Sequence, residues 1–568
     1  MSRLHRFAAG PGIALYIALA ALTCREVGLV GEVAIGWGSK HPPTVLTRFV
    51  SPEMCCWFDY DALGPLVAAQ TRPVERLEIG DQFIPIAINA YTGGLSDLPA
   101  RLVTWAFGWR VGAWTGFALG ALLLALAARF LQIHAGDLAA GLVAVLLATD
   151  WSFVFYKRVL SGTEVLLQAG ALLTVWAIWS RRWRGGVHGT LGIALGLAFG
   201  LQAKATFVAT IAAILIAVVA TRRDQPSLRP PTPLRWSVLL GLPLLGLLPI
   251  GIANLHAATV PVSDRVYSHD TLAMQFQRLG GTGMAREGSA NLLAFFGDPN
   301  AFWSAALHAD PVPWLSVGRA FGWMVLLFGA WIVWTDREGT PSPSDALLRF
   351  LSVLCPAQTA LLFLANHDLH HLAQSSLFWC LALALAACRV AGLWGRPRSL
   401  RRVLLAGALL APTLLSGALQ LVETDGVMRT APQSTFRESG QRALLEMLAA
   451  HDVKRLVTSD YEVYGMLDIR APDIRITHTW AAFTRGERVD TWGLRIPAGR
   501  SGVEPWRVLK LAKGSHYLAL RPTAPMVYNW SPKPSAVQAA AQTAGVTATE
   551  VGALDDAEGR WATLWRIE

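Results

Sequence analysis

The sequence predicts a polytopic α-helical membrane protein with a small α/β domain at its C-terminal end. Two observations predict the membrane part. Only 15% of the 568 residues are charged while 53% are hydrophobic, whereas soluble domains carry about 25% charged residues. Apolar runs of about 20 residues also recur along the chain, as in transmembrane helices. A third observation predicts the α/β domain: beyond about residue 425 the charged fraction rises and the apolar runs shorten.

The apolar runs predict about eleven transmembrane helices. They cover roughly residues 10–28, 110–131, 137–156, 159–180, 188–203, 205–220, 236–256, 316–334, 346–366, 372–391 and 402–422. The first run has the shape of a signal peptide but lacks a convincing cleavage pattern, so we expect an uncleaved helix. The fifth and sixth runs are short and nearly continuous, which favours a tight helical hairpin.

Clusters of Arg and Lys orient these helices. They precede the first run, follow the fourth, and separate the sixth from the seventh, the eighth from the ninth and the tenth from the eleventh. Such clusters collect in cytoplasmic loops, so a cytoplasmic N-terminus places all of them on one side. The net charge of +10 therefore predicts no nucleic-acid partner. We expect a multi-pass protein of the bacterial inner (plasma) membrane, surrounded by membrane lipids.

The same orientation places the outer loop 30–100 and the C-terminal part 425–568 outside the cytoplasm. Helical and strand patterns alternate in the C-terminal part, which predicts an extracytoplasmic α/β domain. Helices are expected at 438–450 and 535–544, and strands at 454–458, 474–477, 516–520 and 561–567. The transmembrane domain then comprises residues 1–424, including the outer loop.

Two carboxylates in the outer loop are the first candidates for chemistry. Asp59 and Asp61 flank Tyr60 in an aromatic stretch, which is typical of a segment at the membrane interface. A positioned carboxylate that takes the proton of an acceptor hydroxyl contributes about 10²–10⁴-fold to a rate. The alternative is two ordinary acids in a solvated loop.

Cations on the outer side are candidates for binding a phosphate. Lys157 and Arg158 end the third run, Glu164 lies one turn into the fourth, and Lys204 separates the fifth from the sixth. A fixed cation binds a phosphate and stabilises it as a leaving group. Contact with lipid headgroups is the alternative for Lys157 and Arg158. A Lys at the bilayer centre costs about 2.5–3.5 kcal/mol, which favours a polar cavity or the outer rim for Lys204.

A histidine-rich turn lies at the outer end of the ninth run. His370 and His371 follow His367 and Asp368, but their spacing matches no closed zinc signature. We assign no metal ligands; a divalent metal cofactor is compatible with the sequence but not required by it. Contact with phosphate or substrate and a plain interfacial cap both remain open for these histidines.

These motifs are spread over roughly residues 10–400, and both their order and their side of the membrane are informative. After the acids come Tyr91-Thr92-Gly93, then Asp150-Trp151-Ser152 before Lys157-Arg158 and Glu164, then Gly196, Gly200 and Lys204, and later the His-His-Leu turn. This pattern resembles the GT-C membrane glycosyltransferases. It is most similar to bacterial relatives of the protein O-mannosyltransferases (glycosyltransferase family 39) and to the aminoarabinose lipid A transferases.

The resemblance implies inverting transfer of a sugar, a hexosyl or pentosyl group, from a polyprenyl-phosphate donor. The acceptor would be a lipid, a glycan or a protein on the outer face. Carried over by position, Asp59 or Asp61 would be the catalytic acidic residue of this loop. Many relatives carry an adjacent Asp-Glu pair there, whereas this chain has Asp-Tyr-Asp, which leaves open which of the two acts. Other substrate contacts would come from Lys157, Arg158, Lys204, Glu164, Tyr91, His370 and His371.

Two other functions stay open. One is a transporter or flippase for a lipid-linked sugar, which usually has paired repeats and broken helices near the bilayer midplane. We find no internal repeat, and the candidate residues gather on one face. The other is a non-catalytic membrane scaffold that uses its outer domain to bind partners.

Overall fold

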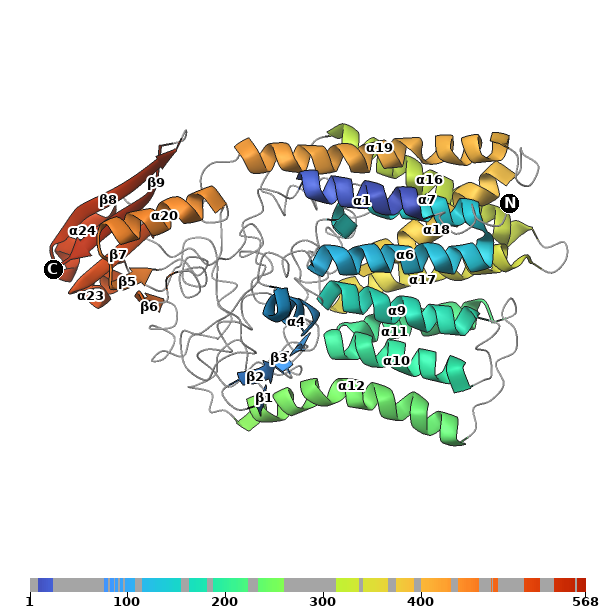
Figure 1. Cartoon of the computed structure of the whole chain (residues 1–568), viewed down its shortest axis with the longest axis horizontal. Coiled ribbons are helices and arrows are strands. Elements are labelled where there is room, and N and C mark those ends of the chain that lie inside the picture. The colour runs from blue at the N-terminus through green and yellow to red at the C-terminus, as the bar shows by residue number, and fades with distance from the viewer. Residues whose placement is uncertain are drawn as a thin grey trace.

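A computed structural model of the chain shows a helix bundle with a mixed β-sheet beyond one of its ends (Figure 1). The residues that it describes are 9–23, 76–79, 82–85, 87–89, 92–94, 98–107, 115–154, 163–180, 187–222, 233–259, 313–336, 341–365, 374–392, 400–430, 438–458, 471, 473–478, 505–520, 536–556 and 559–568.

Within these residues, a helix stands at each of the eleven predicted apolar runs. The helices are α1 (Gly10–Thr23), α6 (Thr115–Ala135), α7 (Asp137–Thr149), α9 (Thr163–Trp179), α10 (Val187–Ala203), α11 (Phe207–Ala220), α12 (Pro233–Thr259), α16 (Pro313–Thr335), α17 (Pro343–Ala365), α18 (Ser376–Gly392) and α19 (Leu400–Thr430). Five of the described helices, α6, α12, α16, α17 and α19, are long and apolar enough to cross a membrane. The chain is therefore mostly helical with several candidate spans, and a total of eleven spans stays a prediction.

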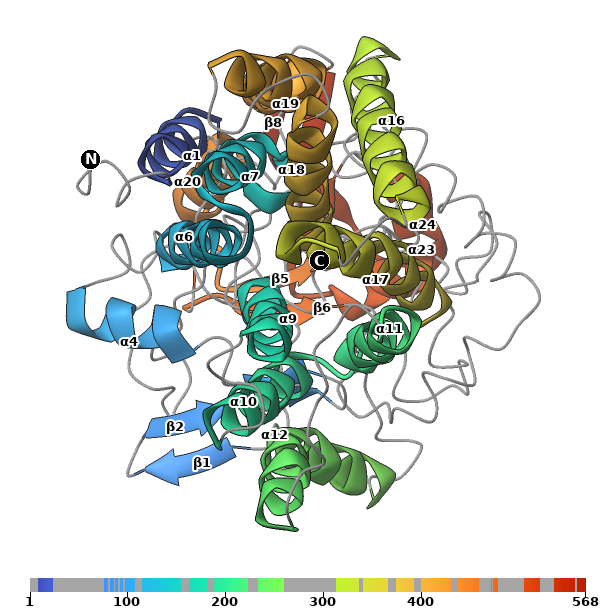
Figure 2. The ribbon, with the colours of Figure 1, turned by 90° about the vertical axis from the view of Figure 1, so that its right-hand side faces the viewer.

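The helices pack in pairs around an apolar core. α9 packs on α10, α10 on α12, α11 on α17, and α16 on α19, as Figure 2 shows in a view along the bundle. The outer face of α12 carries leucines that are more than half exposed, such as Leu240, Leu244 and Leu245. A contiguous exposed apolar surface of this kind suits lipid rather than water.

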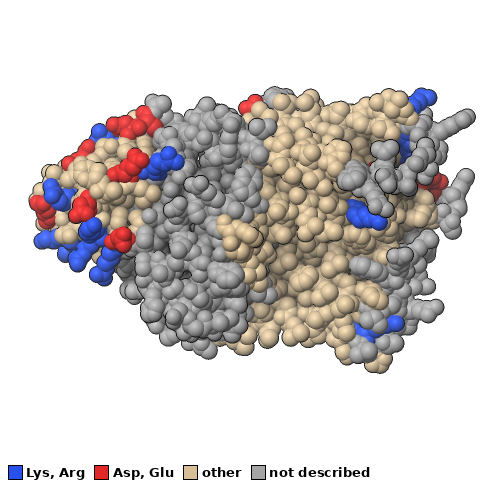
Figure 3. Space-filling model, in the orientation of Figure 1, with Lys and Arg blue, Asp and Glu red and all other residues tan. Residues whose placement is uncertain are grey.

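Several of the described arginines gather at one end of the bundle. We call the end that faces the sheet the sheet end and the opposite end the arginine end. Arg222, Arg349, Arg389 and Arg402 lie at the arginine end. Figure 3 shows the uncharged band between the two ends. The assignment of the arginine end to the cytoplasm stays a prediction.

Part of the outer loop segment lies at the sheet end. Two short hairpins, β1 (Arg76–Ile79) with β2 (Gln82–Pro85) and β3 (Ala87–Asn89) with β4 (Thr92–Gly93), precede α4 (Leu98–Phe107). Figure 2 shows α4 lying across the bundle axis. Its Leu102 and Phe107 side chains are exposed, as expected for a helix at the membrane interface.

The C-terminal part forms a five-stranded sheet in the order β6-β5-β7-β9-β8. Its strands are β5 (Arg455–Thr458), β6 (Arg475–His478), β7 (Ser515–Leu520), β8 (Ala548–Asp556) and β9 (Gly559–Ile567), and its helices are α20 (Glu438–Ala450), α23 (Pro505–Leu511) and α24 (Val537–Ala544). β5 is parallel to β6 and β7, whereas β9 is antiparallel to β7 and β8. The sequence patterns missed β8 and α23.

Both faces of this sheet are covered because adjacent strand residues point to opposite sides. Leu456 enters a core with Leu444 and Leu448 of α20. Val457, the next residue, enters a second core with α23 and α24. The sheet is therefore the middle of three layers. The predicted division of the chain near residue 424 stays a prediction, and α19 continues past it to Thr430.

We expect acid to weaken the C-terminal sheet through His516 on β7. Burial lowers the pKa of His516, and Arg566 and His451 lower it further. The unfolded chain, with a His pKa of about 6.5, then binds more protons than the folded chain, so stability falls as pH drops below about 6.5. The loss should be small because the side chain is half-buried. The rate of limited proteolysis of the full chain, followed as the pH is lowered, would measure this loss. In His516→Gln the rate should rise less at acid pH. An equal rise in the variant and the native chain would contradict the assignment.

Candidate functional site

A stripe of small residues brings α9 and α10 together. Gly196 and Gly200 are four residues apart and share one face of α10. A Cβ on Gly170 of α9 would lie 2.6 Å from the Gly196 carbonyl oxygen and 2.8 Å from the Gly200 amide nitrogen. Small residues at such spacing allow two helix backbones to approach closely. The stripe therefore fixes how the two helices align.

This alignment brings Glu164 and Lys204 to the same level of the bundle. Glu164 precedes Gly170 by about 9 Å of helix, and Lys204 follows Gly200 by about 6 Å, both toward the sheet end. Lys204 follows Gly200 at the same spacing of four residues. Each side chain is only 2% exposed. Two oppositely charged residues predicted from the sequence thus lie deep in the sheet end of the same helix pair.

Further polar side chains are buried in this bundle. Gln168, one turn after Glu164, donates from Nε2 to Ser376 Oγ at 3.3 Å and so joins α9 to α18. Gln358 of α17 donates to Thr210 Oγ1 of α11 at 3.0 Å. All four side chains are buried. We call Glu164, Gln168, Lys204 and Ser376 the buried polar cluster, since they interrupt an otherwise apolar core.

The outer-loop segment packs onto the end of α10, two residues before Lys204. A Cβ added to Gly93 of β4 would collide with the carbonyl oxygen and the side chain of Gln202 at the end of α10. Gly93 and Gln202 are both buried. A glycine is therefore required where the Tyr91-Thr92-Gly93 motif meets α10, and Lys204 lies two residues further along the chain.

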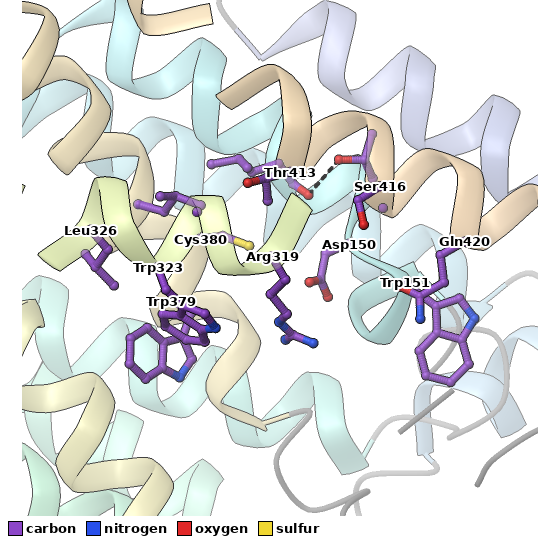
Figure 4. A pocket seen from close by; sticks show the side chains of 15 residues that line it. Asp150, Trp151, Arg319, Trp323, Leu326, Trp379, Cys380, Thr413, Ser416 and Gln420 are labelled. Carbon is purple, nitrogen blue, oxygen red and sulfur yellow. Dashed lines mark hydrogen bonds between the residues drawn. The ribbon is translucent and has the colours of Figure 1, made fainter. Parts of the chain in front are cut away.

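A pocket of about 90 Å³ opens between α7, α16, α18 and α19 (Figure 4). We call it the Arg319 pocket. Its lining residues are Leu146, Thr149, Asp150, Trp151, Arg319, Gly322, Trp323, Leu326, Trp379, Cys380, Leu383, Thr413, Ser416, Gly417 and Gln420.

Two opposite charges face each other in this pocket. Asp150 of the α7 end is close enough to act electrostatically on Arg319 of α16. The carboxylate also has a structural role, because its Oδ1 accepts from Ser152 Oγ at 2.6 Å and from the Phe153 amide at 2.8 Å. Asp150 ends α7 with an extended backbone and caps the helical turn that follows. The run expected at 137–156 is therefore broken at this residue.

Close contacts between backbones frame the Arg319 pocket. A Cβ on Gly417 of α19 would collide with the carbonyl oxygen of Thr149. A Cβ on Gly318 of α16 would collide with the carbonyl oxygen of Pro412. Thr413 Oγ1 donates to the Gly318 carbonyl at 2.8 Å and holds the second crossing. These crossings fix the walls of the pocket.

We expect Gly417→Ala to lower the thermal stability of the bundle. The added methyl group meets backbone rather than a movable side chain, and overpacking costs about 1–3 kcal/mol. Gly407→Ala is the matched control on the same helix, because nothing lies within 4 Å of its added Cβ. Unfolding temperatures of both variants in detergent would measure the difference. Equal temperatures would show that α7 and α19 are not held this closely.

Seven of the predicted site residues lie outside the described residues. They are Asp59, Asp61, Tyr91, Lys157, Arg158, His370 and His371. Lys204 and Glu164 are described, and the structure brings them to one level of the bundle. Among the described residues, no group of three or more His, Cys, Asp or Glu side chains could hold a metal ion.

The sequence reasoning missed Arg319 and the pocket around it. One signal was present: an arginine inside an apolar run is costly in a membrane and marks a functional candidate. Asp150 and Trp151 belong to a motif that is visible in the sequence, but nothing in the sequence places them beside Arg319, because the lining comes from four helices that are distant in the chain.

No family model matches this chain, and no curated protein matches it. Several solved structures are similar to it. The chain is similar to ArnT from Cupriavidus metallidurans in the apo state, with a TM-score of 0.49 and 11% identity over 98% of this chain and 97% of that one. For the same protein bound to undecaprenyl phosphate the TM-score is 0.47 and the identity 12%, with the same coverage.

The apo oligosaccharyltransferase of Archaeoglobus fulgidus is also similar, with a TM-score of 0.41 and 12% identity over 85% of this chain and 66% of that one. All three similarities are at 12% identity or less and at TM-scores below 0.5, so the GT-C resemblance rests on the sequence motifs.

Proposed function

We propose that this chain is an inverting membrane glycosyltransferase. Its donor would be a sugar on a polyprenyl phosphate, and its acceptor a hydroxyl group of a lipid, glycan or protein on the outer face of the inner membrane. The observation that carries the proposal is the buried pair of Glu164 and Lys204, at one level of the sheet end. Ionisable residues inside a membrane bundle are costly and mark functional sites.

The buried polar cluster supports the donor half of the proposal. A lysine ammonium is a compact positive charge that binds phosphate oxygens. In a water-poor site it also stabilises the charge that develops on a phosphate as it leaves. Lys204 has this chemistry at the end of α10, beside the loop segment in which Gly93 packs. Lys157 and Arg158 are the further predicted contacts with the phosphate.

The reaction would be a direct displacement at the anomeric carbon. The oxygen of the acceptor hydroxyl forms a bond to this carbon while the bond from the carbon to the phosphate oxygen breaks. Asp59 or Asp61 takes the hydroxyl proton, and the polyprenyl phosphate leaves with the bonding electron pair. Attack from the face opposite to the leaving group inverts the configuration.

A transfer assay on the full chain tests this function. The protein would be reconstituted in lipid vesicles with a polyprenyl-phosphate donor that is labelled in its sugar, together with a cell-envelope extract as acceptor. We expect labelled product and released polyprenyl phosphate in equal amounts. Movement of the donor between leaflets without product would favour a flippase instead. Binding of a partner protein without any binding of donor would favour a scaffold.

A further inference from the structure

The Arg319 pocket has a polar mouth and an apolar floor. Asp150, Arg319 and Gln420 lie toward the sheet end of their helices. Leu326 lies about two turns beyond Arg319 on α16, and Leu383 lies about two turns into α18 from its sheet end. Figure 4 shows Trp323, Trp379 and Leu326 on one side of the two charged side chains, with Gln420 on the other. A ligand that fits must therefore be amphiphilic, with its apolar end inward.

The charges at the mouth select the head of such a ligand. Asp150 and Arg319 lie near each other with opposite charges, so a phosphate or an ammonium group finds no net attraction there to offset the loss of its hydration. A neutral group with several hydroxyls satisfies both, because each hydroxyl donates to a carboxylate or accepts from a guanidinium. The side-chain amide of Gln420 can both donate and accept a hydrogen bond. The mouth thus favours a neutral polyhydroxyl head over a charged one.

The depth of the pocket limits the apolar end. Arg319 and Leu326 are seven residues apart on α16, which is about 10 Å of helix. The hydrocarbon core of a bilayer is about 30 Å thick, so a lipid chain of one leaflet spans about 15 Å and would not fit between the mouth and the floor. The floor suits a short alkyl group or a single ring against Trp323 and Trp379, whose ring centroids are 4.3 Å apart.

We propose that the Arg319 pocket is a second binding site, for a neutral hydroxyl-bearing amphiphile with a short apolar end. It is formed by α7, α16, α18 and α19 rather than by the α9–α10 pair that carries Lys204. Its assignment to the acceptor rests on the proposed glycosyl transfer. Binding of the amphiphile itself does not depend on that function.

Photolabelling of the full chain in lipid nanodiscs tests the site. The probe is hexyl β-glucoside with a diazirine at the end of its alkyl chain, and labelled residues are mapped by peptide mass spectrometry. We expect labels on α16 around Leu326 and on α18 around Leu383, abolished by excess unlabelled hexyl glucoside. Labels confined to lipid-facing leucines such as Leu244 would overturn the proposal.

A pair of neighbouring substitutions separates the pocket from the lipid surface. Leu326 is 5% exposed and faces the pocket, whereas Leu327 is 68% exposed on the outside of α16. Leu326→Trp should fill the floor and reduce labelling at least about tenfold, and Leu327→Trp should leave it unchanged. Equal labelling in the two variants would place the probe outside the pocket.

Competition between head groups tests the role of the two charges. In the native chain, hexyl phosphate and hexylammonium should compete at least about tenfold less well than hexyl glucoside. Asp150→Asn should admit hexyl phosphate, and Arg319→Gln should admit hexylammonium. Equal competition by all three compounds in every variant would refute selection by charge. This readout requires no transfer, so it can succeed or fail independently of the glycosyltransferase assay. If both succeed, hexyl glucoside should also inhibit transfer, and absence of inhibition would refute only the assignment to the acceptor.

Discussion

The double variant Asp59→Asn, Asp61→Asn is expected to lose about 10²–10⁴-fold in the rate of sugar transfer, the range that a positioned general base contributes. The amide keeps the size of each side chain and removes only its ability to take a proton. The transfer assay with labelled donor would measure the loss. Glu78→Gln, which changes an acid on β1 of the same loop segment, is the control and should keep full activity.

The single variants decide which aspartate acts. If one of them is the base, its Asn variant should equal the double variant, and the other single variant should stay near the native rate. Full activity in both single variants and in the double variant would remove these residues from the mechanism. Unchanged binding of the labelled donor would show that the step lost is chemistry.

Lys204→Met is expected to lower kcat/KM for the lipid donor by about 10²–10³-fold, the cost of removing one group that stabilises a developing negative charge. Methionine fills a similar volume without the charge. Because removing one member of a buried pair leaves the other charge, here Glu164, uncompensated, this variant should also unfold at a lower temperature than the native chain. Lys204→Arg keeps the charge and should recover part of the activity.

Two measurements test whether Lys204→Met loses activity only because it is misfolded. The unfolding temperature in detergent shows whether the variant is folded, and Lys454→Met on the exposed surface near the C-terminal sheet provides a substitution of the same kind. Lys454 is 70% exposed beside Asp452, so its loss should change neither quantity. Native activity in Lys204→Met would separate the buried polar cluster from the reaction.

The sequence predicts the helices of the bundle well because each one is a long apolar run, and a run of that length has few other stable structures in a membrane. Lys204 and Glu164 could also be found, since a charge beside such a run is conspicuous. That both residues lie at one level of the bundle could not be predicted from the sequence. It depends on the contact of Gly170 with Gly196 and Gly200, which is a property of two helices rather than of one segment.

Other features depend on partners that the local sequence does not show. β8 contains few β-branched or aromatic residues, so it has a weak strand pattern, but it pairs with β9 along its length. Tertiary pairing thus overrides its local preference. Arg319 is a single charge within an apolar helix, and only the meeting of four helices turns it into part of a pocket.

α19 also has a mechanical consequence. Its apolar stretch ends at Glu423, but the helix continues to Thr430, which adds about two turns or roughly 10 Å beyond the hydrocarbon region. A continuous helix transmits tilt and rotation, whereas a flexible linker absorbs them. α19 therefore acts as one rigid rod as far as Thr430: any tilt at its crossing with α16 is carried out of the lipid to that residue. The same helix lines the Arg319 pocket, so a change in the pocket that tilts α19 would also move its outer end.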